Sequence, residues 1–100
     1  MGNSVYNASK SALNGFAHSL ALEVASKWVR VNTVLPGFVE TSILGRNRSD
    51  EEVKKHLSDY PLGRFGTPKD VSSLVSFLLS DEASWITGAQ IPIDGGFSMK

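Results

Sequence analysis

Tyr6 and Lys10 lie four residues apart, and together they are the residues whose types and spacing could perform chemistry. Four steps along an α-helix rotate by about 400°, so on a helix the two side chains would lie about 40° apart on one face. At neutral pH a phenol is a proton donor, and a neighbouring ammonium favours its phenolate form. The pair could therefore exchange a proton with a carbonyl or alcohol oxygen. The same spacing is also common on plain helix surfaces, and both interpretations stand at this point.

The element that must position this pair is predicted to be a helix from about residue 5 to residue 27. It contains no proline, and its apolar residues recur at helical spacing: Leu13, Phe16, Ala17, Leu20, Ala21 and Val24. Gly15 should weaken the helix by up to about 1 kcal/mol relative to alanine and permits the close approach of another backbone. Residues 29–35, rich in β-branched side chains, should form a buried strand that Pro36–Gly37 ends.

The remainder predicts a second helix and a second strand. Residues 38–61 are polar and irregular, with one short exposed helix whose acidic residues come first and basic residues last. Thr67 and Asp70 can form a capping box that begins a helix ending near residue 80. Residues 89–93 should be a strand, followed by a glycine turn at residues 94–96. The order helix, strand, loop, helix, strand predicts an α/β fold with two parallel strands and a right-handed crossover.

Composition narrows the classes of function. The chain has 100 residues, 20% of them charged, and a formal net charge of zero, which argues against a nucleic-acid or anionic-membrane binder. It contains no cysteine, and its two histidines have no partners at metal-ligand spacing, so no metal site is expected. Neither a targeting segment nor an apolar run of membrane-spanning length is present, and a soluble cytoplasmic protein is expected.

Several motifs occur in the order and approximate spacing of the short-chain dehydrogenase/reductase family. The run Tyr6–Leu13 and its continuation Leu20–Glu23 resemble the family's active-site helix. The other matching motifs are Arg30–Asn32, Pro36–Thr41, Pro61–Val71, Ile86–Gly88 and Ile93–Gly96. The resemblance covers essentially the whole chain. It implies an oxidoreductase that transfers a hydride between NAD or NADP and a carbonyl/alcohol substrate.

The resemblance also implies roles for individual residues. Tyr6 would be the catalytic proton donor or acceptor, and Lys10 would assist it and bind the nicotinamide ribose, so both would contact the cofactor. The other residues that would bind the cofactor are Pro36, Gly37, Val39 and Thr41. In isolation, the first two would be interpreted as a strand-ending turn and Thr41 as a cap. Trp28 stands where many relatives have glycine, and we interpret it as a packing residue.

Compared with the family, the chain corresponds to a C-terminal fragment, residues 1–100, whose N-terminal cofactor-binding half is missing. It has no glycine-rich turn to hold a pyrophosphate. We therefore expect a partial Rossmann-like, doubly wound fold that is incomplete for catalysis alone and that forms oligomers. The family's substrate-facing loop would correspond to residues 40–60. The substrate and the choice between NAD and NADP stay open.

Two alternatives to an enzyme remain. The chain could be a non-catalytic interaction module that associates with a full-length relative, because in the family the Tyr/Lys helix also contributes to a subunit contact. It could also be the product of a degraded gene without function.

Overall fold

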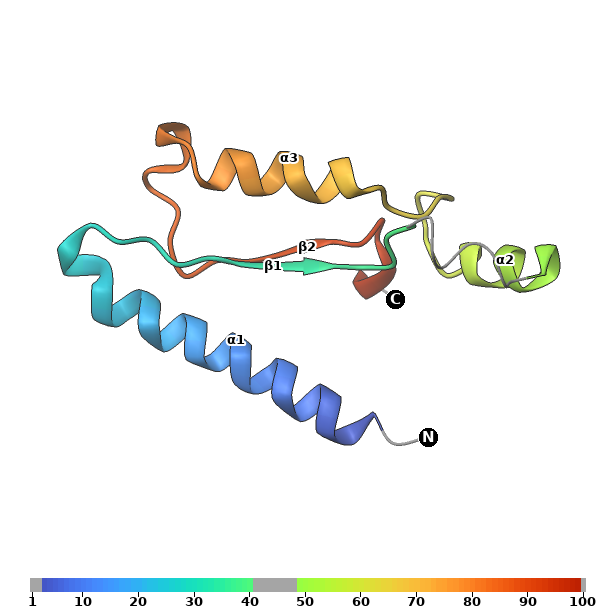
Figure 1. Ribbon diagram of the computed structural model, residues 1–100, viewed down its shortest axis with the longest axis horizontal. Helices are drawn as coiled ribbons and strands as arrows, with labels where there is room; N and C mark the ends of the chain where they lie inside the picture. Colours follow the sequence, from blue (N-terminus) through green and yellow to red (C-terminus); the bar gives the residue numbers. More distant parts are fainter. Residues whose placement is uncertain (1–2, 41–48, 100) are drawn as a thin grey trace. The chain divides into compact units, whose positions relative to one another are not determined.

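The computed structural model describes residues 3–40 and 49–99. Its strands β1 (Thr33–Pro36) and β2 (Gln90–Ile93) pair in a two-stranded parallel sheet (Figure 1). The other elements, in chain order, are α1 (Ser4–Val24), η1 (Ala25–Lys27), α2 (Asp50–Leu57), α3 (Pro68–Leu78), η3 (Asp81–Ala83) and η4 (Phe97–Met99). The predicted α/β class and its order of elements are confirmed.

The chain divides into two compact units. The first comprises Met1–Thr33 and Leu78–Ile91, and the second comprises Val34–Phe77 and Pro92–Lys100. Each unit therefore joins segments that are distant in the sequence.

In the first unit, α1 is the long helix that the apolar spacing predicts, and it continues into the 3-10 turn η1. Ala21 is buried on its face, and a Cβ added at Gly88 would lie 3.8 Å from the Ala21 Cβ. The small residue at each position therefore permits this close approach. Large apolar side chains elsewhere on α1, by contrast, are exposed: Val5, Leu13, Phe16 and Leu22.

The strand after η1 is shorter than predicted. Residues 29–32 are not part of β1, and the Val31 backbone bonds to the segment before β2. The Val31 N–H donates to the Thr87 hydroxyl over 3.1 Å, and the Gly88 N–H donates to the Val31 carbonyl over 2.7 Å. The prediction of a strand from residue 29 was wrong because β-branched side chains alone do not reveal which backbone will be the neighbour.

Two side chains of the Arg30–Asn32 motif tie the same segments together. The Arg30 guanidinium donates to the carbonyl oxygens of Leu78, over 2.7 Å, and Ile86, over 3.3 Å. The Asn32 side chain donates to the Ile86 carbonyl over 3.0 Å and accepts from the Ala89 N–H over 3.0 Å. The motif therefore has a structural role, since it supplies partners to carbonyls at the end of α3 and in the segment that follows it.

In the second unit, the predicted capping box at the start of α3 is confirmed. The Asp70 N–H donates to the Thr67 hydroxyl over 3.3 Å, and the Thr67 N–H donates to the Asp70 carboxylate over 2.7 Å. Arg64 adds a bidentate pair with the same carboxylate, with distances of 2.7 and 3.1 Å. The Arg64 hydrogen bond, together with the Thr67 backbone and side chain, holds the pKa of Asp70 well below its usual value. The helix ends at Leu78, slightly earlier than predicted.

The short helix α2 is also confirmed, and it begins where the Ser49 hydroxyl accepts from the Glu52 N–H over 3.3 Å. Beyond it, aromatic rings gather around Phe65. The ring centroid of Phe65 lies 4.8 Å from that of Phe38, 5.7 Å from that of Tyr60 and 6.2 Å from that of His56. These contacts join α2 and the segments on either side of it within the second unit.

The glycine turn after β2 is as predicted. Gly95 and Gly96 have φ of +60° and +91°, a conformation that glycine adopts without the steric cost of a side chain. The Asp94 carboxylate accepts hydrogen bonds from the Gly96 and Ser98 N–H groups, over 3.1 and 3.0 Å. Hydrogen bonds with Ser98, and secondarily with Gly96, lower the pKa of Asp94.

Candidate active site

Tyr6 and Lys10 lie together on the first turns of α1. The Lys10 Nζ is 5.6 Å from the centroid of the Tyr6 ring, so the two side chains share one face of the helix. A cation within about 6 Å of an aromatic centroid is attracted to the ring.

The Tyr6 side chain is accessible, with 61% of its surface exposed. Nearby, the Ser9 hydroxyl donates to the Tyr6 backbone carbonyl over 2.7 Å, which leaves the phenol itself uninvolved in that contact. Within residues 3–40 and 49–99, no hydrogen bond is made by the Tyr6 hydroxyl. Its oxygen is therefore accessible from solvent.

Pro36, Gly37 and Val39 lie at and just beyond the end of β1, in the second unit. The Gly37 N–H donates to the Ile93 carbonyl over 2.9 Å and so extends the pairing of the two strands. A Cβ at Gly37 would lie 2.9 Å from the Asp94 Cβ, which is closer than real Cβ contacts allow. Glycine is needed at position 37 because of this close approach.

The backbone N–H and C=O of Val39 are available as a donor and an acceptor. Val39 forms an isolated parallel bridge with Gly66, in which the Gly66 N–H donates to the Phe38 carbonyl over 3.0 Å and the Glu40 N–H donates to the Gly66 carbonyl over 2.9 Å. In such a bridge the neighbours of the central residue make the bonds, and the central residue's own groups point the other way. No partner for the Val39 N–H or C=O occurs in the described part of the chain.

Of the predicted site residues, Tyr6 and Lys10 belong to the first unit, and Pro36, Gly37 and Val39 belong to the second. The structure thus defines the geometry within each of the two groups. Thr41 lies outside the described residues.

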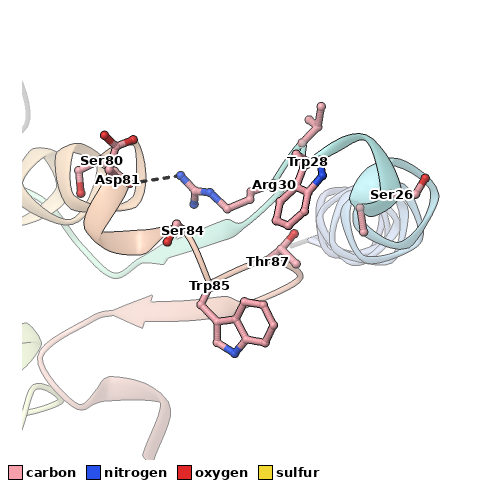
Figure 2. A pocket seen from close by; sticks show the side chains of 10 residues that line it. Ser26, Trp28, Arg30, Ser80, Asp81, Ser84, Trp85 and Thr87 are labelled. Atoms are coloured by element: carbon pink, nitrogen blue, oxygen red, sulfur yellow. Dashed lines mark hydrogen bonds between the residues drawn. The ribbon is translucent and has the colours of Figure 1, made fainter.

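The sequence interpretation missed a cavity of about 590 Å³ in the first unit. Figure 2 shows that the indoles of Trp28 and Trp85 reach it from different segments, while Arg30 is directed towards the Ser80–Asp81 segment. The two indoles are 89% and 93% exposed. The other lining residues are Ala25, Ser26, Val29, Ser84 and Thr87. The cavity contains neither Tyr6 nor Lys10, and its arginine is engaged by backbone carbonyls, so we do not assign the predicted chemistry to it.

Trp28 was interpreted as a packing residue, and this was wrong. Its side chain is almost fully exposed, and its backbone has φ of +60°, the left-handed conformation that glycine favours. The glycine found in many relatives at this place was the signal of that conformation.

Residues 3–40 and 49–99 contain no group of three or more histidine, cysteine or carboxylate side chains that could hold a metal ion. No helix in the same part of the chain has the length and apolar character needed to cross a bilayer.

Comparison with known protein families gives a match over residues 1–98 to the family described as enoyl-(acyl carrier protein) reductase. Among curated proteins, the chain is 50% identical over 94 residues to the 3-oxoacyl-[acyl-carrier-protein] reductase FabG of Buchnera aphidicola, which covers 94% of the chain and 38% of that protein. The chain thus spans about two-fifths of the length of the curated relatives that it matches.

Solved structures agree with these matches. A short-chain dehydrogenase family protein from Francisella tularensis is 38% identical, with a TM-score of 0.86 over 97% of this chain and 44% of that one. A 4-hydroxyisoleucine dehydrogenase complexed with NADH is 34% identical, also with a TM-score of 0.86, over 95% of this chain and 40% of that one.

Proposed function

The chain belongs to the short-chain dehydrogenase/reductase family, and from this premise we propose that it is the catalytic segment of a nicotinamide-dependent oxidoreductase. The reaction would interconvert a carbonyl and an alcohol. The observation that carries the proposal is the placement of the Lys10 ammonium 5.6 Å from the centroid of the exposed Tyr6 ring.

Tyr6 supplies the proton. In the reducing direction NADH or NADPH, when bound, would supply the hydride for the carbonyl carbon. The Tyr6 O–H bond breaks as its proton passes to the carbonyl oxygen, which becomes the hydroxyl of the alcohol. Tyr6 is left as a phenolate and regains a proton from solvent. In the oxidising direction the same phenolate accepts the proton of the alcohol.

Lys10 stabilises the charge that this transfer creates. Its ammonium lies beside the ring that becomes negative, so it favours the phenolate more than the neutral phenol. The interaction therefore grows as the proton leaves, which is what lowers a reaction barrier. We also propose that Lys10 donates to the hydroxyls of the nicotinamide ribose.

The backbone of Val39 fits the amide end of the cofactor. A carboxamide has one carbonyl acceptor and an NH₂ donor group, and Val39 presents one N–H and one C=O that have no partner within the described residues. Pro36 and Gly37 precede it and would line the ring, with Thr41 close to the carboxamide or phosphates. The NADH named for the 4-hydroxyisoleucine dehydrogenase supports a nicotinamide cofactor.

A hybrid enzyme tests this function. The aligned segment of the Buchnera reductase is replaced with residues 1–98 of this chain, and oxidation of NADH or NADPH is followed with the relative's 3-oxoacyl substrate. We expect saturable cofactor binding and turnover above the rate without substrate. A folded hybrid that binds the cofactor and gives no turnover, beside an active unmodified reductase, would contradict the proposal.

The exposed apolar residues on α1 favour a second candidate function, that of an interaction module. Val5, Leu13 and Phe16 present large side chains to solvent on one helix, and such surfaces are typical of protein contacts. In this case the chain would associate with a copy of itself or with a full-length relative.

Co-purification and light scattering test the second candidate. A stable complex between the chain and a full-length relative, abolished by Phe16→Asp and retained by the control His18→Gln, an exposed residue about 160° around the helix from Phe16, would favour it. A chain that stays monomeric and binds no relative would exclude it.

A further inference from the structure

We infer that Tyr60 is a positioning residue for the backbone that would face the nicotinamide, and that its hydroxyl fixes the start of the Phe38–Val39 segment. The inference rests on the proposed function, because it concerns the same cofactor contact at Val39. Tyr60 itself would not touch the cofactor.

The position of the Tyr60 hydroxyl is fixed by packing of its ring. Tyr60 is only 9% exposed. Its ring centroid lies 5.2 Å from that of Phe97 and 5.7 Å from that of Phe65. On another side, a Cβ added at Gly37 would lie 3.2 Å from the Tyr60 Cε1. A ring held from several directions keeps its hydroxyl in one place.

That hydroxyl accepts a hydrogen bond from the Phe38 N–H over 3.1 Å. The successive backbone donors of this segment thus have different partners: Gly37 donates to the Ile93 carbonyl, Phe38 to Tyr60, and Glu40 to the Gly66 carbonyl. Only one of these partners is a side chain. The bond from Tyr60 fixes the peptide between Gly37 and Phe38, and the bonds from Gly66 fix the two peptides around Val39.

Removing the Tyr60 hydroxyl would therefore change the segment in a specific way. The Phe38 N–H would lose this hydrogen bond, and the peptide between Gly37 and Phe38 would be held less firmly. Loss of a part-buried hydrogen bond is costly, so the backbone would shift at this point. The Val39 N–H and C=O would then be less well aligned for a carboxamide, and part of the cofactor's binding free energy would be spent on ordering them.

Tyr60 stands at the boundary between two segments of the sequence. It is the last residue of the segment 40–60, which the family resemblance places beside the substrate, and it precedes the Pro61–Val71 motif. One hydrogen bond therefore links the end of the substrate-facing segment to the nicotinamide-facing backbone.

The test uses the complete 100-residue chain labelled with ¹⁵N. Hydrogen exchange is measured at the Phe38 amide, and NADH is titrated into the millimolar range while the Val39 amide is observed. The variant Tyr60→Phe keeps the ring and removes the hydroxyl. The control Ser58→Ala removes a hydroxyl from the same segment, one that donates to the Lys55 carbonyl over 2.6 Å.

In Tyr60→Phe we expect exchange at Phe38 to become about five- to tenfold faster, with the Gly37 and Gly66 amides unchanged. We expect the dissociation constant for NADH, read at Val39, to rise about three- to tenfold. Ser58→Ala should change neither value. If Tyr60→Phe did not fold, replacement of Tyr60 by 3-fluorotyrosine, whose hydroxyl is a poorer acceptor, should shift both values in the same direction.

Three results would overturn the inference, and they are distinguishable. Unchanged exchange at Phe38 in Tyr60→Phe would show that the hydroxyl does not hold the peptide. Faster exchange with unchanged NADH affinity would show a structural bond without a positioning role. A Val39 amide that does not respond to NADH even in the unmodified chain would count against the proposed cofactor contact itself, and the inference would fall with it.

Discussion

Gly37 and Asp94 approach so closely that no side chain fits at position 37. A Cβ at Gly37 would lie 2.9 Å from the Asp94 Cβ and 3.0 Å from its Cα. Since the second of these atoms is backbone, the clash is not relieved by a rotamer change. This contact fixes the end of β1 against the turn that follows β2, and it gives the glycine a packing reason independent of any cofactor.

We therefore expect Gly37→Ala to destabilise the chain by about 1–3 kcal/mol, as overpacking does. The urea midpoint measured by circular dichroism reports the change, provided that the slope of the transition stays constant. A Gly37→Ala variant as stable as the parent would show that the two segments can separate without cost.

Gly15 provides the matched control and a test of the alternative function. A Cβ at Gly15 meets nothing within 4 Å among the described atoms, and the residue lies inside α1. Gly15→Ala should therefore stabilise the helix by about 0.5–1 kcal/mol. If α1 instead packs closely against another chain at this position, Gly15→Ala would lower the association constant, which sedimentation measures.

Trp28 should be replaceable by glycine with a gain in stability. A left-handed backbone costs a residue with a side chain about 1–2 kcal/mol, and Trp28, with φ of +60°, gains little from packing because it is exposed. Trp28→Gly should therefore raise the free energy of unfolding by up to about 1 kcal/mol, the glycine's greater freedom in the unfolded chain offsetting part of the gain. The urea midpoint is again the measurement.

Trp85→Gly is the control for that substitution, because Trp85 is equally exposed and has no positive φ. It should lower stability or leave it unchanged. A stabilising effect of the same size at both positions would mean that loss of an exposed indole, rather than relief of backbone strain, is responsible.

Acid should weaken the second unit through Asp70. Because the folded state holds the pKa of Asp70 below its unfolded value of about 3.9, the carboxylate stabilises the fold above that pH, and the contribution is lost as the pH falls towards the folded-state pKa. Asp70→Asn should therefore flatten the dependence of the urea midpoint on pH below about 4. Asp94, whose pKa is also lowered, should keep part of the slope.

Asp81→Asn serves as the control for this experiment, since the Asp81 carboxylate forms no ion pair with the described residues. Arg64→Gln removes the largest cause of the Asp70 shift and should resemble Asp70→Asn. If the pH dependence of the urea midpoint persisted in both Asp70→Asn and Arg64→Gln, groups other than Asp70 would be responsible for it.

Local signals predicted much of the fold from the sequence. The capping box at Thr67 and Asp70 needs only side chains three residues apart, and the glycine turn at residues 94–96 follows from the conformational freedom of glycine. The predicted start of β1 at residue 29 was wrong. Where the strand begins depends on pairing with the Thr87–Gly88 segment, which is distant in the sequence.

Some features of the candidate site could likewise be predicted from local sequence, and others depend on contacts between distant residues. The shared face of Tyr6 and Lys10 follows from helix geometry, so spacing alone indicated it. The open donor and acceptor of Val39 depend on its bridge with Gly66, and the role of Tyr60 depends on a hydrogen bond across 22 positions of sequence. Neither has a local signal. The only signal for the left-handed conformation at Trp28 was the glycine that the family resemblance implies at this position.

The central claim is that Tyr6 moves the proton, and the turnover number of the hybrid enzyme with Tyr6→Phe tests it most directly. We predict a fall in kcat of about 10²–10⁴-fold, the usual contribution of a general acid, with cofactor binding retained. Lys10→Met should also lower kcat, whereas Lys27→Met, which removes an exposed lysine at the far end of the first helical segment, should not. A Tyr6→Phe hybrid that turns over within twofold of its parent would contradict the account.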